Sequence, residues 1–128
     1  MGPTAGKFRS EQRRVNMERE LEFSTRTDRD AVIVDVSGQI DLGNSPALRK
    51  SLLESLAGTE RLAINLQGVK YIDSSGIASL LEVLQAARKS TKRLILFGVT
   101  GSVLKVLQLT RLTGVFEIRE TELQALEA

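Results

Sequence analysis

A carboxylate, two hydroxyls and a glycine follow one another at Asp73, Ser74, Ser75 and Gly76, within the segment YIDSSGIASLL. An apolar pair precedes them and apolar residues at helical spacing follow. The sequence therefore predicts that these four residues occupy the turn between a strand and a helix. Hydroxyl groups at such a turn have three uses: as a catalytic nucleophile, as a cap for the helix, or as the site of a modification.

Catalysis by either serine lacks the other groups that it needs. A serine nucleophile usually requires an adjacent base, most often histidine, and the chain contains no histidine. The segment matches neither the Gly-x-Ser-x-Gly turn of the α/β-hydrolases nor the glycine-rich loops that bind nucleotide phosphates. With no cysteine, a thiolate metal site is also excluded. We therefore expect no enzymatic activity, no cofactor and no metal site.

Capping and modification both fit the residues. Ser74 or Ser75 could accept a backbone N–H that has no partner within the helix, with Gly76 permitting a close approach to the sheet. Capping alone does not explain why Asp73 and two hydroxyls lie together at an exposed turn. A phosphate here would add about −1.5 to −2 charges, which a helix N-terminus tolerates. Such a modification would change partner binding while the fold survives.

Hydrophobic periodicity and turn signals divide the chain into alternating strands and helices. The first two strands are expected to form a hairpin with its turn near residues 28–30. Ser45 is placed to cap the next helix, Pro46 suits its first position and Gly58 its end. Predicted strands span residues 20–26, 31–38, 61–66, 93–98 and 114–118, and predicted helices span residues 46–57, 75–89, 101–112 and 120–128. This order, ββαβαβαβα, indicates an α/β fold with a largely parallel or mixed sheet and helices packed on it.

The predicted helices carry further signals. Ser102 is a candidate cap for the third helix. Apolar residues at helical spacing predict the faces that the first two helices turn toward the sheet. These residues are Leu48, Leu52, Leu53 and Leu56 in the first helix, and Leu80, Leu81 and Leu84 in the second.

Length, composition and charge limit the organisation of the protein. Its 128 residues are 41% hydrophobic and 27% charged, which suits one globular domain. No apolar run is long enough to cross a bilayer and no signal segment opens the chain, which together with the lack of cysteine favours a cytoplasmic protein. We expect a disordered basic tail at residues 1–17 and one domain at residues 18–128. Because five basic and two acidic residues fall within the first 19, against a net charge of +2 overall, the domain is near neutral and direct nucleic-acid binding is not expected.

Three segments resemble a known family in order and spacing, namely GQIDLGNSPALRKSLL, LAINLQGVKYIDSSGIASLL and LILFGVTGSVLKVLQLTRLTGVF. The resemblance is to the STAS domain, and most of all to the anti-sigma factor antagonists, and it covers residues 18–124. The IDSSG motif is its most specific part. The resemblance implies a single α/β domain in which helices pack on one side of a mixed sheet.

The resemblance also implies a function, a switch of binding partners. In such antagonists the first serine of Asp-Ser-Ser-Gly, which matches Ser74, is phosphorylated by an anti-sigma factor that is itself a serine kinase. The unphosphorylated antagonist binds that kinase and frees its sigma factor, and a PP2C-type phosphatase restores this form. Asp41 matches an acidic position near the phosphorylated loop, so the implied partner-binding residues are Asp41, Asp73, Ser74, Ser75 and Gly76.

Two departures from the family pattern are visible. Gln39 stands where the family often has glutamate, and GIASLL replaces the commoner Gly-Leu-Gly after the motif. Other STAS domains are accessory subunits of lipid-transport complexes or parts of stress-sensing assemblies. Such an accessory role, without a phosphorylation switch, is the alternative function.

Overall fold

One mixed sheet organises the protein, whose computed structural model describes residues 5–8 and 21–128. Its strands lie in chain order: β1 (Ala5–Phe8), β2 (Leu21–Asp28), β3 (Ala31–Ile40), β4 (Arg61–Ile72), β5 (Arg93–Phe97) and β6 (Glu117–Arg119). The first two pairings are antiparallel, and the other three, whose strands are joined by the predicted helical crossovers, are parallel. The predicted hairpin is confirmed, because Asp28 pairs with Ala31 across a two-residue turn.

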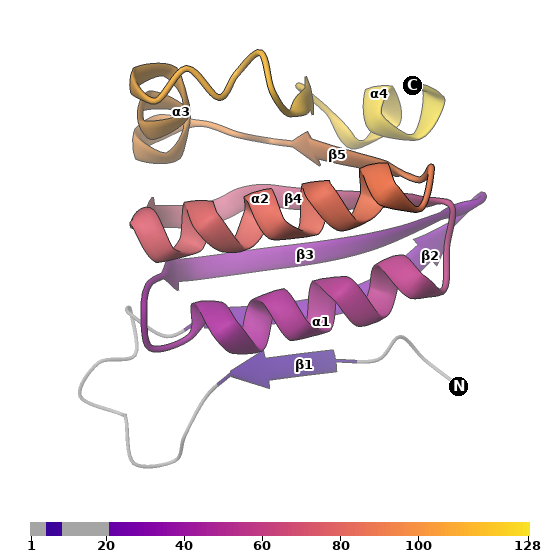
Figure 1. The fold of residues 1–128 in the computed structure, drawn as a ribbon, viewed down its shortest axis with the longest axis horizontal. Coiled ribbons are helices and arrows are strands. Elements are labelled where there is room, and N and C mark those ends of the chain that lie inside the picture. The colour runs from indigo at the N-terminus through magenta and orange to yellow at the C-terminus, as the bar shows by residue number, and fades with distance from the viewer. Residues whose placement is uncertain (1–4, 9–20) are drawn as a thin grey trace.

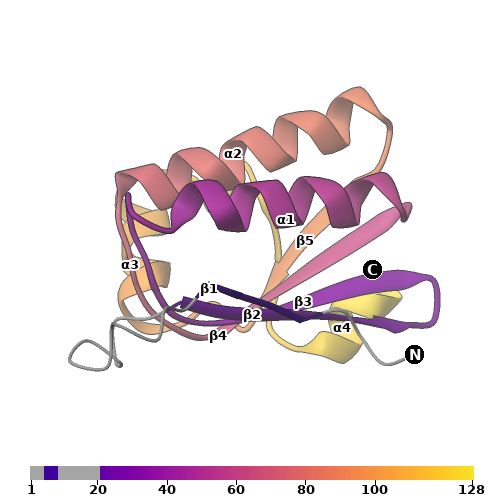
Figure 2. The same ribbon diagram turned by 90° about the horizontal axis from the view of Figure 1, so that it is seen from below.

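Three helices provide the crossovers between parallel strands, and a fourth ends the chain. They are α1 (Ser45–Ala57), α2 (Ser74–Lys89), α3 (Gly101–Leu109) and α4 (Glu122–Glu127). Helices α1 and α2 run side by side over one face of the sheet (Figures 1 and 2). Helix α3 adds Val103 and Leu107 to the core beneath them.

Helix α4 packs on the opposite face of the sheet (Figure 2), so the expectation that helices cover one side holds for α1 and α2 and is wrong for α4. The reason lies in the alternation of side chains along central strands. Ile33, Ala63 and Ile95 point away from α1 and α2 and would be exposed there. Ala125 and Leu126 of α4 cover them.

The buried face of α2 differs by one residue from the predicted stripe. Leu80 and Leu84 are buried as expected, whereas Leu81 is only partly buried and Val83 is fully buried. At 100° per residue, Leu81 and Val83 each lie about 60° outside the arc from Leu80 to Leu84, on opposite sides of it. Ser79 and Ala87 are buried on the Val83 side, so the buried face of α2 is centred toward Val83 and Leu81 falls at its margin. In α1 the stripe is confirmed, with Leu53 at its partly buried edge.

The N-caps of two helices precede the predicted caps, by one residue in α1 and by two in α3. Asn44, and not Ser45, is the N-cap of α1, with Ser45 already helical, whereas Gly58 is its C-cap as expected. Thr100, and not Ser102, precedes α3. The Ser102 hydroxyl instead donates a hydrogen bond of 2.6 Å to the carbonyl of a β4 residue, which ties the start of α3 to the sheet.

Residues 5–8 form strand β1, which pairs with β2, so the prediction that residues 1–17 are unstructured is wrong for this segment. The prediction relied on the lack of an apolar face. Strand pairing uses backbone groups, however, and without β1 the strand β2 would be an open edge of the sheet. The rest of the predicted tail and the predicted domain start at residue 18 lie outside the described residues.

Candidate functional site

The Asp-Ser-Ser-Gly motif lies where β4 ends and α2 begins, at the left end of the molecule in Figure 1. Asp73 is the N-cap of α2: its Oδ1 accepts hydrogen bonds from the backbone N–H groups of Ser75 (2.9 Å) and Gly76 (3.0 Å). The hypothesis that one of the serines caps this helix is therefore wrong. A carboxylate at the N-cap satisfies the same orphan donors and also suits the positive end of the helix dipole.

The two serine hydroxyls differ in what they contact. The Ser75 hydroxyl donates to Asp73 Oδ1 at 2.6 Å and accepts from the Ser45 hydroxyl at 3.3 Å, in a half-buried position. Ser74, the first residue of α2, is exposed. Within the described part of the chain its hydroxyl has no hydrogen-bond partner. Of the two, only Ser74 presents a free hydroxyl at the surface.

A second turn, between β3 and α1, is bonded to the motif. The N–H of Asp73 donates to the carbonyl of Ile40 at 3.1 Å, and Asp73 Oδ2 accepts from the N–H of Leu42 at 3.2 Å. Asp41 lies between these two contacts, half-buried, and its own Oδ1 accepts from the N–H of Gly43 at 3.0 Å. Asp41 is thus adjacent to the motif in space, as the resemblance implies, although it is 32 positions away along the chain.

Gly76 brings α2 close to the strand ends, as predicted. A Cβ on this residue would lie 2.6 Å from Ile72 Cγ1 and 2.7 Å from Ile40 Cγ2, distances that side chains do not adopt. The first turn of α2 therefore packs directly on β3 and β4. This close contact sets the position of Ser74 relative to the ends of β3 and β4.

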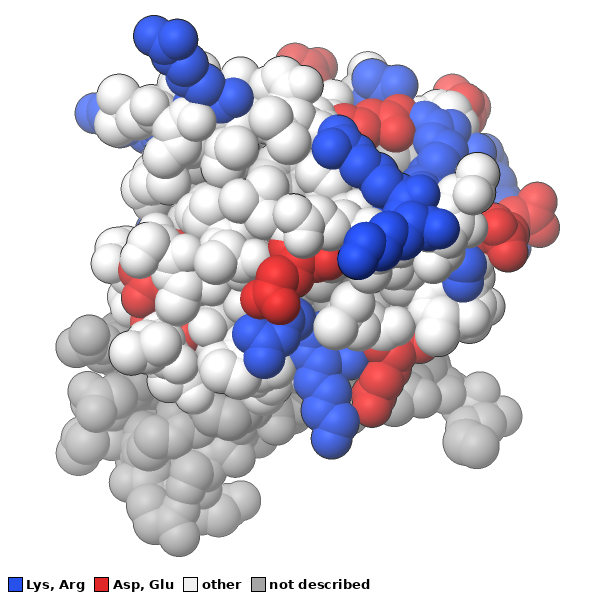
Figure 3. Space-filling view, in the orientation of Figure 1, with Lys and Arg blue, Asp and Glu red and all other residues white. Residues whose placement is uncertain are grey.

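Asp73 is ionised in this setting. Burial alone would raise the pKa of its carboxyl, but hydrogen bonds from the Ser75 hydroxyl and from the N–H groups of Gly76, Ser75 and Leu42 together hold that pKa below its usual value. The surroundings are otherwise poor in charge: Figure 3 shows mostly uncharged side chains at the end where α1 and α2 begin. A partner here meets a free hydroxyl beside a fixed negative charge.

The family model of the STAS domain matches residues 22–125, which is most of the chain. The chain belongs to the STAS domain family. A Staphylococcus aureus protein named anti-sigma-B factor antagonist is 28% identical over 101 residues, covering 78% of this chain and 94% of that protein.

Solved structures of similar fold include an anti-sigma factor antagonist from Mycobacterium paratuberculosis. Its TM-score is 0.77 at 24% identity, and the match covers 85% of this chain and 93% of that one. The Bacillus cell fate determinant SpoIIAA in its phosphorylated form has a TM-score of 0.64 at 20% identity, with 82% and 96% covered. At these identities the structures support the fold of this STAS domain.

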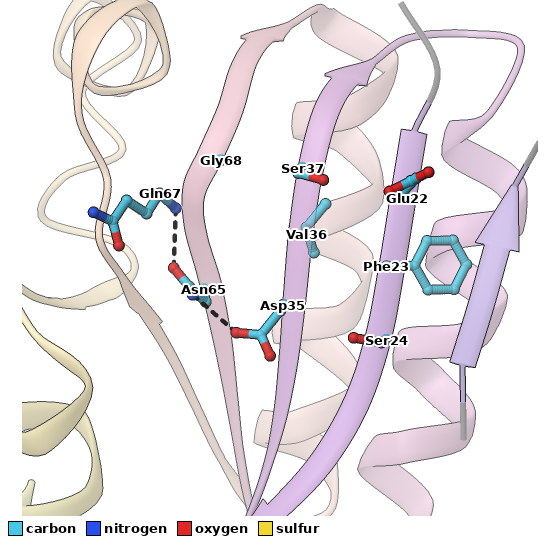
Figure 4. Close-up of a pocket in the computed structure, with 9 residues that line it drawn as sticks. All are labelled: Glu22, Phe23, Ser24, Asp35, Val36, Ser37, Asn65, Gln67 and Gly68. Carbon is cyan, nitrogen blue, oxygen red and sulfur yellow. Dashed lines mark hydrogen bonds between the residues drawn. The ribbon is translucent and has the colours of Figure 1, made fainter. Parts of the chain in front are cut away.

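The STAS domain has a second polar cluster that sequence reasoning missed. A cavity of about 500 Å³ opens on the face of the sheet opposite α1 and α2, over β2, β3 and β4 (Figure 4). Asn65 donates from Nδ2 to Asp35 Oδ1 at 2.8 Å and accepts from the N–H of Gln67 at 3.0 Å. Asp35 also pairs with Arg26 at 2.6 Å, and Arg26 in turn pairs with Glu122 of α4 at 2.6 Å.

This cluster anchors α4. Hydrogen bonds from Arg26 lower the pKa of Asp35 and of Glu122, so both carboxylates are ionised and already paired. Arg61 adds a hydrogen bond to the carbonyl of Leu126. No sequence signal links Arg26 to Glu122, which lie 96 positions apart.

In residues 5–8 and 21–128, no three acidic, histidine or cysteine side chains are grouped so that they could hold a metal ion. None of the helices in that described part is both long enough and apolar enough to cross a membrane.

Proposed function

We propose that this STAS domain is an anti-sigma factor antagonist controlled by phosphorylation of Ser74. The unphosphorylated form binds an anti-sigma factor that is a serine kinase, and the sigma factor is released. Phosphorylation of Ser74 by that kinase ends the binding, and a PP2C-type phosphatase restores it. The observation that carries the proposal is the exposed, unbonded hydroxyl of Ser74 at the first turn of α2. The names of the relatives support the antagonist role.

The contacts of the two serines support Ser74 as the acceptor. Phosphorylation of Ser75 would break its 2.6 Å hydrogen bond to Asp73 and place a phosphate against that carboxylate in a half-buried position. At Ser74 the phosphate can extend into solvent from the start of α2. The helix dipole favours negative charge there, so the domain stays folded.

The same geometry explains how a phosphate would prevent binding. Asp73 is ionised and lies next to Ser74, and Asp41 is in the neighbouring turn. A partner complementary to the neutral hydroxyl would have to accommodate about two further negative charges beside these carboxylates. One unpaired, desolvated charge costs about 2–5 kcal/mol of affinity, and every 1.4 kcal/mol or so is tenfold.

In this proposal the domain acts through binding and has no catalytic activity of its own. The chain has no histidine that could activate Ser74. The Asp73 carboxylate beside it already accepts hydrogen bonds from three residues. Turnover of an ester or of a nucleoside triphosphate by the isolated domain, lost in Ser74→Ala, would contradict this part.

The test is titration calorimetry of the purified cognate anti-sigma factor against wild type, Ser74→Asp and Ser74→Ala. We expect Ser74→Asp to bind at least tenfold more weakly and Ser74→Ala to bind like wild type. In a kinase assay, Ser75→Ala should be phosphorylated and Ser74→Ala should not. Circular dichroism confirms that each variant folds. Equal affinity of wild type and Ser74→Asp would refute the switch and favour an accessory role in a lipid-transport or stress-sensing assembly.

A further inference from the structure

Leu42 is an exposed leucine on the turn that is bonded to the phosphorylation motif. Its side chain is 74% exposed, and among the described residues the other large exposed hydrophobics are Tyr71, Leu109 and Leu123. Leu42 alone of these four donates its backbone N–H to Asp73, the residue before Ser74. We infer that Leu42 is an apolar anchor that inserts into a pocket of the anti-sigma factor, an inference that rests on the proposed function.

The turn that carries Leu42 is held rigidly from both sides. The N–H of Asp41 donates to Asn44 Oδ1 at 2.9 Å, and Asn44 Nδ2 donates to the carbonyl of Gln39 at 2.9 Å. Asn44 is only 4% exposed, and Gly43 is bonded back to Asp41. Because the backbone is already ordered, binding through Leu42 has a low entropic cost.

The Leu42 side chain has no comparable role inside the domain. At 74% exposure it contributes little to the core, although the backbone of Leu42 is held by the hydrogen bond that its N–H donates to Asp73 in the neighbouring turn. Removing a leucine side chain from water is strongly favourable, and interface energy is concentrated in a few such anchors. A rigid turn that presents an apolar side chain to solvent is suited to supply one.

The position of Leu42 relative to Ser74 identifies the occupant. Both turns meet at the Asp73 carboxylate, whose Oδ2 bonds Leu42 and whose Oδ1 bonds the first turn of α2. A kinase that reaches the Ser74 hydroxyl must therefore cover the turn of Leu42 as well. On the face that Figure 3 shows, the end of the molecule where α1 and α2 begin is mostly uncharged, and the two turns themselves carry Asp73 and Asp41. We therefore expect an apolar pocket bordered by a cationic or hydrogen-bond-donating side chain.

The hydrogen bond from the Leu42 N–H to Asp73 would also transmit the effect of phosphorylation to Leu42. The contact between the Leu42 N–H and Asp73 is 3.2 Å, the longest of the hydrogen bonds that Asp73 accepts. A phosphate on Ser74 repels the Asp73 carboxylate, and this contact is the one most readily lost. Phosphorylation would thus add charge and also weaken the link between the motif and the turn that presents Leu42.

The experiment compares two leucines of nearly equal exposure. Leu109, at the far end of α3, is 76% exposed and serves as the matched control for Leu42. In calorimetry with the purified anti-sigma factor, Leu42→Ala should weaken binding at least tenfold, or about 1.4 kcal/mol. Leu109→Ala should stay within twofold of wild type, and both variants should melt like wild type.

The outcomes separate the anchor from the switch. If Ser74→Asp loses binding while Leu42→Ala binds like wild type, the anchor is refuted and the proposed function stands. If Leu42→Ala and Leu109→Ala weaken binding equally, the effect is not specific and the anchor is again refuted. If Leu42→Ala abolishes only self-association, measured by light scattering, the turn is an interface between copies of this chain and the inference is wrong.

Discussion

Replacing Asp73 by alanine removes the acceptor that joins two turns and caps α2. Loss of an N-cap acceptor costs about 0.5–2 kcal/mol. The Leu42 N–H and the Ser75 hydroxyl also lose their partner. Because both can bond to water at this half-exposed site, these two groups add only about 1 kcal/mol to the loss in free energy of unfolding. We therefore expect Asp73→Ala to lower the free energy of unfolding by about 2 kcal/mol.

Thermal and urea unfolding followed by circular dichroism measure this loss. For a domain of this size, 1 kcal/mol shifts Tm by on the order of 4 °C, so Asp73→Ala should melt about 8 °C below wild type. Asp73→Asn is the control, because asparagine caps helices as well as aspartate does; it should lose less than half as much. Unchanged melting of Asp73→Ala would refute the capping role. Equal losses in both variants would show that charge, and not the cap, stabilises the turn.

Three further predictions concern packing and charge. Gly76→Ala should cost about 1–3 kcal/mol in urea unfolding, because its Cβ would overlap Ile72 and Ile40, whereas Gly114→Ala, with open space around it, should be neutral. Leu80→Ala should cost about 2–5 kcal/mol and partly buried Leu81→Ala clearly less; equal losses would contradict the register of α2. Since its ion pair lowers the pKa of Glu122, this carboxylate stabilises the fold above its unfolded pKa of about 4.3 and loses that effect as pH falls. Between about pH 5 and 3, the free energy of unfolding of Glu122→Gln should accordingly fall less than that of wild type. Parallel profiles of this free energy against pH would show that the Arg26–Glu122 ion pair does not cause the acid dependence.

Local patterns in the sequence were sufficient to predict most of the fold. The period of apolar residues distinguishes strands from helices, and Gly58 and the turn at residues 28–30 mark ends that depend only on neighbouring residues. The placement of Asp73 to Gly76 between a strand and a helix follows from the same local signals. These predictions hold because the backbone preferences that they use act over a few residues.

The wrong predictions concern places where neighbouring residues allow more than one structure. Asp73, Ser74 and Ser75 are all acceptable N-caps, and the carboxylate is the one that accepts the N–H groups. Strand β1 was missed because pairing through backbone groups leaves no apolar pattern. Leu81 and Val83 differ in burial because the buried arc of α2 is centred toward Val83, and the apolar stripe does not fix this rotation of the helix.

The sequence by itself determined the order of elements, the type of fold and a motif with two hydroxyls at a strand-to-helix turn. Tertiary structure decided which hydroxyl is free and what surrounds it. The Ser75 hydroxyl accepts a hydrogen bond from Ser45, 30 positions away, and the Asp73 carboxylate accepts one from the N–H of Leu42, 31 positions away. These groups meet because parallel pairing of β3 and β4 brings both strand ends to the same edge of the sheet. Contacts between residues so far apart depend on the packing of whole elements, which no local pattern of residues encodes.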